Sequence, residues 1–104
     1  MIYIISLKYI RPIEEVKAHL DTHRQWLATH ARAGRILAAG PCEDQSGGIV
    51  LAHCRDRAEV DAMVAEDSFM VHRVAEAAVQ GFEPAIRAAA LGPQWAGNAA
   101  VVVD

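Results

Sequence analysis

The hydrophobic positions of the first third of the chain follow the pattern of a strand and then that of a helix. Segment Ile2–Tyr9 is rich in Ile and Tyr, and both of its alternating faces begin with apolar residues, which favours a strand that is covered on both sides for part of its length. From there apolar residues recur at helical spacing, at Ile13, Val16, Leu20, Leu27 and Ala31. Gly34 accepts the left-handed conformation that often follows a helix, so we expect one helix over residues 13–33.

Two further strands are expected in the middle of the chain. Segments Arg35–Gly40 and Gly48–Cys54 are apolar, and the polar, turn-prone stretch between them predicts a hairpin. Asp56 and Glu59 then have the spacing of residues that cap the start of a helix. This second helix is expected to end near Asp67 and Ser68, and residues 69–73 to form at most a short helical turn.

Residues 75–86 are predicted to form the last strand, in which Pro84 indicates a sheet edge or a bulge. The resulting order, strand, helix, strand, strand, helix, strand, is that of an α+β, ferredoxin-like split βαβ fold. In this fold two helices cover one face of a four-stranded antiparallel sheet. The other face stays open, so two subunits are expected to stack sheet on sheet as a homodimer.

The tail lies outside this arrangement. We expect a ferredoxin-fold domain over residues 1–87 and a C-terminal tail over residues 88–104. The valines at its end, Val101, Val102 and Val103, are expected either to add an edge strand or to dock on the partner subunit. The pattern does not distinguish these two possibilities.

Composition narrows the possible partners and the compartment. With 104 residues, 53% hydrophobic and 22% charged, the chain is long enough for one core and too apolar to be disordered. Its net charge of −3 and the lack of a basic run give no reason to expect nucleic acid. No apolar run predicts a membrane span or an export signal, so Cys42 and Cys54 are expected to stay reduced in the cytoplasm.

His23 is the first candidate for chemistry. It falls on the flank of the apolar stripe of the first predicted helix, beside Val16 and Leu20. Histidine is the side chain whose ordinary pKa lies nearest neutrality, so a half-buried one can both take and return a proton. The alternative is a hydrogen-bonded packing residue without a catalytic role.

Other kinds of site have less support. His19 and His23 have a spacing that can hold a metal, but no third ligand follows at motif spacing. Cys42 has no evident base to activate it as a nucleophile. The sequence has no glycine-rich phosphate loop and no dinucleotide-binding fingerprint. We therefore expect neither a metal nor an organic cofactor.

An ordered set of motifs resembles the YCII-related proteins. The set consists of His23 in the first helix, Gly34, the Ala39-Gly40-Pro41 end of the second strand, Gly48, and Asp67-Ser68-Phe69 after the second helix. The resemblance covers residues 1–87. The family usually has proline where this chain has Ser68, so the fixed backbone angle of proline is lost beside Asp67.

The resemblance implies a dimeric ferredoxin-like α/β barrel with an active site built on His23 and Asp67. A carboxylate that accepts from one ring nitrogen would leave the other free to move a proton. The alternative for Asp67 is a surface turn residue, and a helix-capping role is not expected because a helix is predicted to end there. Expected substrate-binding residues are Ser6, which interrupts an apolar strand, Trp26, which follows His23 by one turn, and Gly40, Pro41 and Phe69.

Two functions follow from these expectations. The first is a cofactor-free enzyme that uses the pair for general acid/base chemistry on a small hydroxylated aromatic ring or lactone. Isomerisation and elimination are both open to such a site, and proteins of this kind include a dehydrochlorinase of a chlorinated hydroxyhydroquinone. The alternative is a dimeric binding or accessory domain in which the pair is structural or binds a metabolite.

Overall fold

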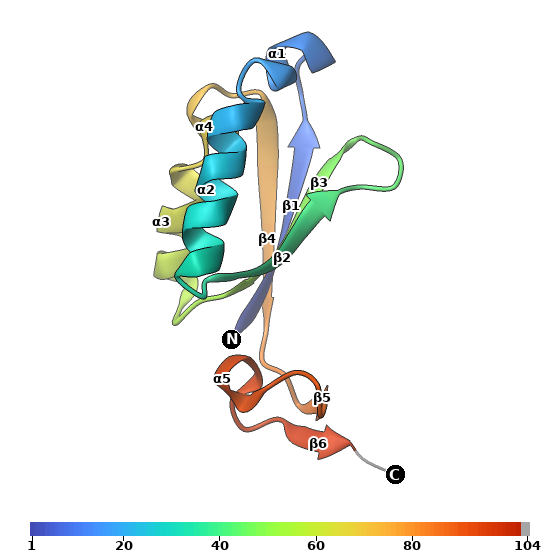
Figure 1. Ribbon diagram of the computed structural model, residues 1–104, viewed down its shortest axis with the longest axis vertical. Coiled ribbons are helices and arrows are strands. Elements are labelled where there is room, and N and C mark those ends of the chain that lie inside the picture. Colours follow the sequence, from blue (N-terminus) through green and yellow to red (C-terminus); the bar gives the residue numbers. More distant parts are fainter. Residues whose placement is uncertain (103–104) are drawn as a thin grey trace.

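Strand β1 (Ile2–Tyr9) lies inside a four-stranded antiparallel sheet with the order β2-β3-β1-β4. The other strands are β2 (Ile36–Pro41), β3 (Gly47–His53) and β4 (Ala75–Phe82). The computed structural model, which describes residues 1–102, places the helices of this domain on one face of the sheet (Figure 1). The predicted α+β, ferredoxin-like order of elements is confirmed.

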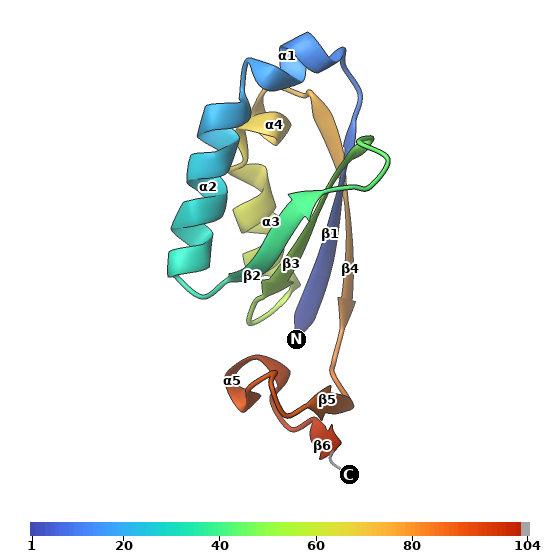
Figure 2. The same ribbon diagram turned by 45° about the vertical axis from the view of Figure 1, so that its right-hand side comes forward.

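The core lies between this sheet and helices α2 (Leu20–Arg32) and α3 (Arg57–Ala65), which Figure 2 shows side by side. Tyr3, Ile5 and Leu7 alternate along β1 toward the helices and are all buried. Val50 and Ala52 pair opposite Ile5 and Tyr3 and complete the buried face. None of the helices in residues 1–102 is long and apolar enough to cross a membrane.

The opposite face of the sheet carries no helix and has a mixed surface. Ile4 and Leu51 are opposite each other there and are half-buried, while Phe82 at the end of β4 is 45% exposed. Polar residues share this face by strand register, among them Lys8, His53 and Gln80. The first strand is therefore apolar on its open face only toward its beginning.

The first predicted helix is interrupted. The structure contains α1 (Ile13–Lys17), a turn at Ala18 and His19, and then α2. His19 has φ −113° and ψ 11°, outside the helical region. Val16 of α1 packs with Phe69 and Val74 at the end of the sheet. The chain therefore changes direction between α1 and α2, and the buried apolar residues of the two helices contact different parts of the domain. Since neither Gly nor Pro occurs at the turn, the residue types gave no sign of it.

The buried face of α2 also differs from the predicted stripe. Its buried residues are His23, Trp26 and His30, whereas Ala31 is exposed and Leu27 only partly buried. His23 therefore lies on the buried face rather than on its flank. The stripe was misplaced because polar aromatic rings, which the pattern did not count as core, occupy the buried positions.

The remaining elements follow the prediction with shifted ends. Asp56 caps α3 by accepting from the Glu59 amide at 2.9 Å, as expected, but the helix ends at Ala65. A short helix α4 (Ser68–Val71) leads into β4. Because β4 ends at Phe82, Pro84 lies beyond the strand and causes no bulge in it.

Residues 83–102 form an arm that projects from one end of the domain (Figure 1). This C-terminal arm contains β5 (Ile86–Ala88), α5 (Pro93–Ala96) and β6 (Ala100–Val102), and β5 pairs with β6 in parallel. Val101 and Val102 thus add no edge strand to the four-stranded sheet, because their partner is β5. Val103 lies outside the described residues.

The pairing of β1 with β3 depends on Gly47. A Cβ atom at this residue would overlap the backbone oxygen of Leu7, whereas a Cβ at Gly40 would meet no atom within 4 Å. We expect Gly47→Ala to lower the free energy of unfolding by at least about 2 kcal/mol, since the two strands would have to separate. Urea unfolding followed by circular dichroism measures this, with Gly40→Ala as control. Equal midpoints for the two variants would contradict the prediction.

Candidate functional site

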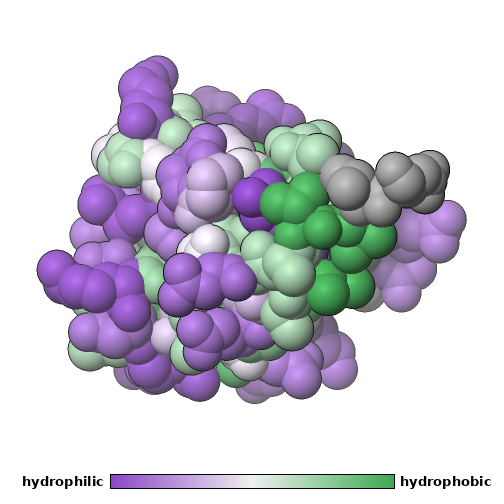
Figure 3. Space-filling model, turned by 90° about the horizontal axis from the view of Figure 1, so that it is seen from below, coloured by the Kyte–Doolittle hydropathy of each residue, from purple (hydrophilic) through white to green (hydrophobic). Residues whose placement is uncertain are grey.

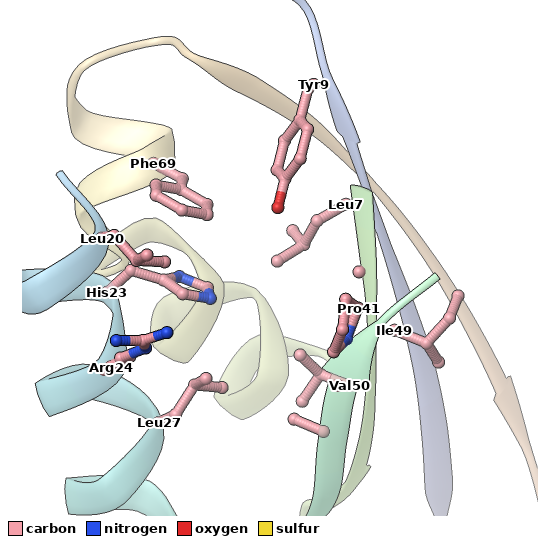
Figure 4. A pocket seen from close by; sticks show the side chains of 13 residues that line it. Leu7, Tyr9, Leu20, His23, Arg24, Leu27, Pro41, Ile49, Val50 and Phe69 are labelled. Atoms are coloured by element: carbon pink, nitrogen blue, oxygen red, sulfur yellow. The ribbon is translucent and has the colours of Figure 1, made fainter. Parts of the chain in front are cut away.

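A cavity of about 260 Å³ opens between α2, α4 and the helix-facing side of the sheet (Figure 4). His23 and Arg24 reach it from α2, and Phe69 from α4. Apolar side chains and backbone supply most of the remaining wall, from Leu7, Leu20, Leu27, Ala39, Gly40, Pro41, Gly48, Ile49 and Val50. The cavity is thus an apolar chamber with a few polar groups on one side.

His23 is held in one orientation by two contacts. Its ring stacks on the ring of Phe69, with centroids 3.9 Å apart and planes within 4°. Its Nδ1 lies 2.8 Å from Oδ1 of Asp67, which is fully buried. Figure 4 shows the other ring nitrogen directed into the cavity.

Asp67 has a second role that the sequence did not indicate. It is the N-cap of α4, and the same Oδ1 accepts from the backbone amide of Phe69 at 3.1 Å. The expectation that Asp67 does not cap was wrong, because a new helix begins directly after it. Oδ2 is also buried and has no hydrogen-bond partner among the described residues.

Hydrogen bonds to Ser68 fix the start of α4 against α2. The Ser68 hydroxyl donates to the carbonyl of His19 at 3.1 Å, and the Thr22 hydroxyl donates to Ser68 at 2.8 Å. These bonds restrain the backbone next to Asp67 at the position where the resembling family usually has proline. A hydrogen bond thus supplies a restraint that a fixed φ angle would otherwise give.

The contact between His23 and an ionised Asp67 assigns the tautomer of the imidazole. A carboxylate can only accept, so Nδ1 of His23 carries the proton and donates it to Asp67. In the neutral ring, Nε2 then has a free lone pair on the side of the cavity. The arrangement can remove a proton from a bound molecule and return it, with the positive charge stabilised by Asp67.

The predicted site residues divide into three groups. His23, Gly40, Pro41 and Phe69 line the cavity, and Asp67 lies directly behind His23. Ser6 does not reach the cavity: it alternates with Leu7 along β1 and lies on the open sheet face. Trp26 does not line the cavity either, because its indole points into the core and donates to the Met63 carbonyl at 2.9 Å.

Two polar lining residues were missed, Tyr9 and Arg24. Tyr9 follows Leu7 on the helix-facing side of β1, so the strand alternation could have found it once that face was known. Arg24 is next to His23 in sequence and resembled any exposed helix residue. Only the position of the cavity relative to α2 distinguishes it from Arg32, the other arginine of that helix.

Cys54 and His19 show no sign of a separate reactive centre among the residues that the structure describes. Burial raises the pKa of the Cys54 thiol to about 11, which disfavours its nucleophilic thiolate form. The ring of His19 stacks on that of His72 with centroids 3.9 Å apart, whereas the ring of His23 stacks on Phe69. Within residues 1–102 no three His, Cys, Asp or Glu side chains are grouped closely enough to hold a metal.

Comparisons with solved structures support the fold. The 5-chloro-2-hydroxyhydroquinone dehydrochlorinase of Burkholderia phenoliruptrix AC1100, in complex with 2,5-dihydroxybenzoquinone, has a TM-score of 0.68 and 19% identity. That match covers 81% of this chain and 95% of the dehydrochlorinase chain. An antibiotic biosynthesis monooxygenase has a TM-score of 0.53 and 19% identity, over 81% of this chain and 100% of its own. At these identities the likeness is one of fold.

Sequence comparison gives the family. No curated protein is significantly similar in sequence to this chain. The YCII-related domain matches residues 1–83, which contain His23, Asp67 and all the residues that line the cavity. The chain is therefore a member of the YCII-related family.

Proposed function

We propose that this protein is a cofactor-free enzyme that uses His23 and Asp67 for general acid/base chemistry on a small hydroxylated ring. The observation that carries the proposal is the buried hydrogen bond of 2.8 Å from His23 to Asp67, with the second ring nitrogen facing a cavity. His23 is the acid/base group that touches the substrate. Asp67 is a positioning residue that acts through His23.

The size and lining of the cavity suit a single ring. An apolar cavity of about 150 Å³ is enough to hold benzene in another protein, so about 260 Å³ leaves room for oxygen or chlorine substituents. Leu7, Val50 and Phe69 provide apolar surface for the ring. A planar substrate can then present its oxygens to the polar side, where His23 and Arg24 lie.

Elimination of HCl from a chlorinated hydroxyhydroquinone is a reaction that such a site can perform. His23 takes a hydroxyl proton and returns it to the ring carbon that bears chlorine, so that a carbonyl forms at the former hydroxyl. Removal of a second hydroxyl proton then forms the second carbonyl while the C–Cl bond breaks and chloride leaves with its electron pair. The net change is loss of HCl to give a quinone, with no oxidant or reductant.

Proton transfer between carbons of an unsaturated lactone needs the same groups and is the second reaction class. The first experiment supplies purified protein with 5-chloro-2-hydroxyhydroquinone and measures chloride release above the uncatalysed rate. The second supplies muconolactone and follows its isomerisation by absorbance. Failure of both reactions, with ring compounds still bound in the cavity, would favour the alternative of a non-catalytic binding domain.

We also propose that the protein is a homodimer formed through the open sheet face, with the C-terminal arm docked on the partner. The arm has apolar surface at its end: Ile86 is 69% and Val102 58% exposed, and Figure 3 shows apolar surface gathered there. Strands β5 and β6 have three residues each, and such a short two-stranded pair has little stability by itself. Contact with a second copy would cover this surface together with Phe82, which is 45% exposed at the end of β4.

The arm prediction is tested with Ile86→Glu. A carboxylate in an apolar contact must be desolvated without a partner, so we expect the dimer dissociation constant to rise at least about tenfold. Sedimentation equilibrium of the full chain measures it. Ile13→Glu is the control, because Ile13 is 46% exposed on α1, away from the arm. Equal dissociation constants for the wild type and Ile86→Glu would exclude the arm from the interface.

A further inference from the structure

Arg24 differs from most arginines of the chain because its guanidinium has no partner. Within residues 1–102 it makes neither a hydrogen bond nor an ion pair, yet it lines the cavity beside the His23 ring (Figure 4). Five other arginines have partners within the protein. The pairs are Arg11 with Glu15, Arg35 with His30, Arg55 with Glu59, Arg57 with Asp61, and Arg87 with the Leu91 carbonyl. A cation at an apolar cavity is therefore available to a ligand.

Tyr9 adds a second available donor. Its ring meets that of Phe69 edge to face at 6.0 Å, and Figure 4 shows its hydroxyl pointing into the cavity. Among the described residues this hydroxyl takes part in no hydrogen bond. The cavity thus presents a guanidinium, a phenol and an imidazole nitrogen, all without partners on the cavity side. These groups favour an oxygen-rich ligand.

We infer that the cavity selects anions, and that Arg24 is the residue that binds the negatively charged group of the ligand. The inference rests on the proposed function for the location of the substrate and narrows its class to phenolates, enolates and carboxylates of a single ring. The protein as a whole carries −3 and repels an anion, so binding of an anion in this cavity needs a local positive group. Arg24 offsets that repulsion where the ligand enters.

Charge-assisted hydrogen bonds from guanidinium to an anionic oxygen are stronger than neutral ones, and more so beside apolar walls. The same contact would favour proton removal by His23, because the substrate becomes more negative as a hydroxyl proton leaves. Arg24 is thus a specificity-determining residue of the proposed site, and its role in binding can be measured without any turnover.

Benzoate and benzamide are suitable probes, since they share one ring and nearly the same shape but differ in charge. We expect wild-type protein to bind benzoate roughly tenfold more tightly than benzamide in isothermal titration calorimetry. Arg24→Gln is expected to abolish this preference and Arg24→Lys to keep part of it. Arg32→Gln is the matched control, because Arg32 is exposed on the same helix, as Arg24 is, but does not line the cavity.

The inference is overturned if benzoate fails to bind at millimolar concentration, if the two probes bind equally, or if the preference survives in Arg24→Gln. Failure of the proposed function is a separate result. Charge selection that persists while no substrate is turned over would retain the anion site and reject the enzyme. Turnover with equal affinity for the two probes would retain the enzyme and reject Arg24 as the selector.

Discussion

Replacing His23 by glutamine is expected to reduce kcat for the proposed substrates by about 100- to 10,000-fold, the usual contribution of a general acid/base group. Glutamine has a similar reach and can still donate to Asp67, but it has no group that takes up a proton near neutral pH. The loss should therefore appear in kcat, while KM changes little. Steady-state kinetics of chloride release or lactone isomerisation measures both constants.

His30→Gln is the control for this prediction. His30 is also buried on α2, but it does not line the cavity. Its Nε2 lies 3.0 Å from Oε1 of Glu66, and its Nδ1 lies 3.0 Å from Nε of Arg35. Its replacement is expected to lower stability and to leave kcat near the wild-type value. If His23→Gln retained full activity, or if it lost activity only by unfolding, the imidazole would be structural and the binding-domain alternative would be favoured.

The fold could be predicted because its elements have clear periodic patterns. Strand β1 is rich in Ile and Tyr and its helix-facing side is apolar, and Asp56 with Glu59 marks the start of α3. The turn between α1 and α2 could not be predicted in this way. At this turn Val16 packs against Phe69 and Val74, which are far from it in sequence.

The residues of the candidate site could be predicted where they belong to motifs in a fixed order along the chain. They could not be predicted where the prediction depended on which face of strand β1 meets the helices. The ordered motifs indicated His23 and Asp67 as a pair, and the structure places them in contact. Ser6 is expected at the cavity because it interrupts an apolar strand, but both faces of β1 begin apolar, so alternation alone does not tell which face meets the helices. Tyr9 was overlooked for the same reason.

Replacement of Asp67 by alanine is the second change with a large expected effect, and it acts on stability and activity together. Loss of the α4 cap should cost about 1 kcal/mol, and the Nδ1–H of His23 left without an acceptor in a buried place about 1–3 kcal/mol more. We therefore expect the free energy of unfolding to fall by about 3 kcal/mol in urea titrations. The freed imidazole should also lose its orientation, so kcat falls in the molecules that stay folded.

Asp56→Ala separates these two contributions, because Asp56 caps α3 in the same way but is exposed and has no histidine partner. We expect this variant to lose about 1 kcal/mol and no activity. The difference between the two variants then measures what the buried contact with His23 adds to an ordinary helix cap. Equal losses of stability would show that Asp67 serves only as a cap, and unchanged kcat in folded Asp67→Ala would mean that His23 needs no carboxylate to hold it.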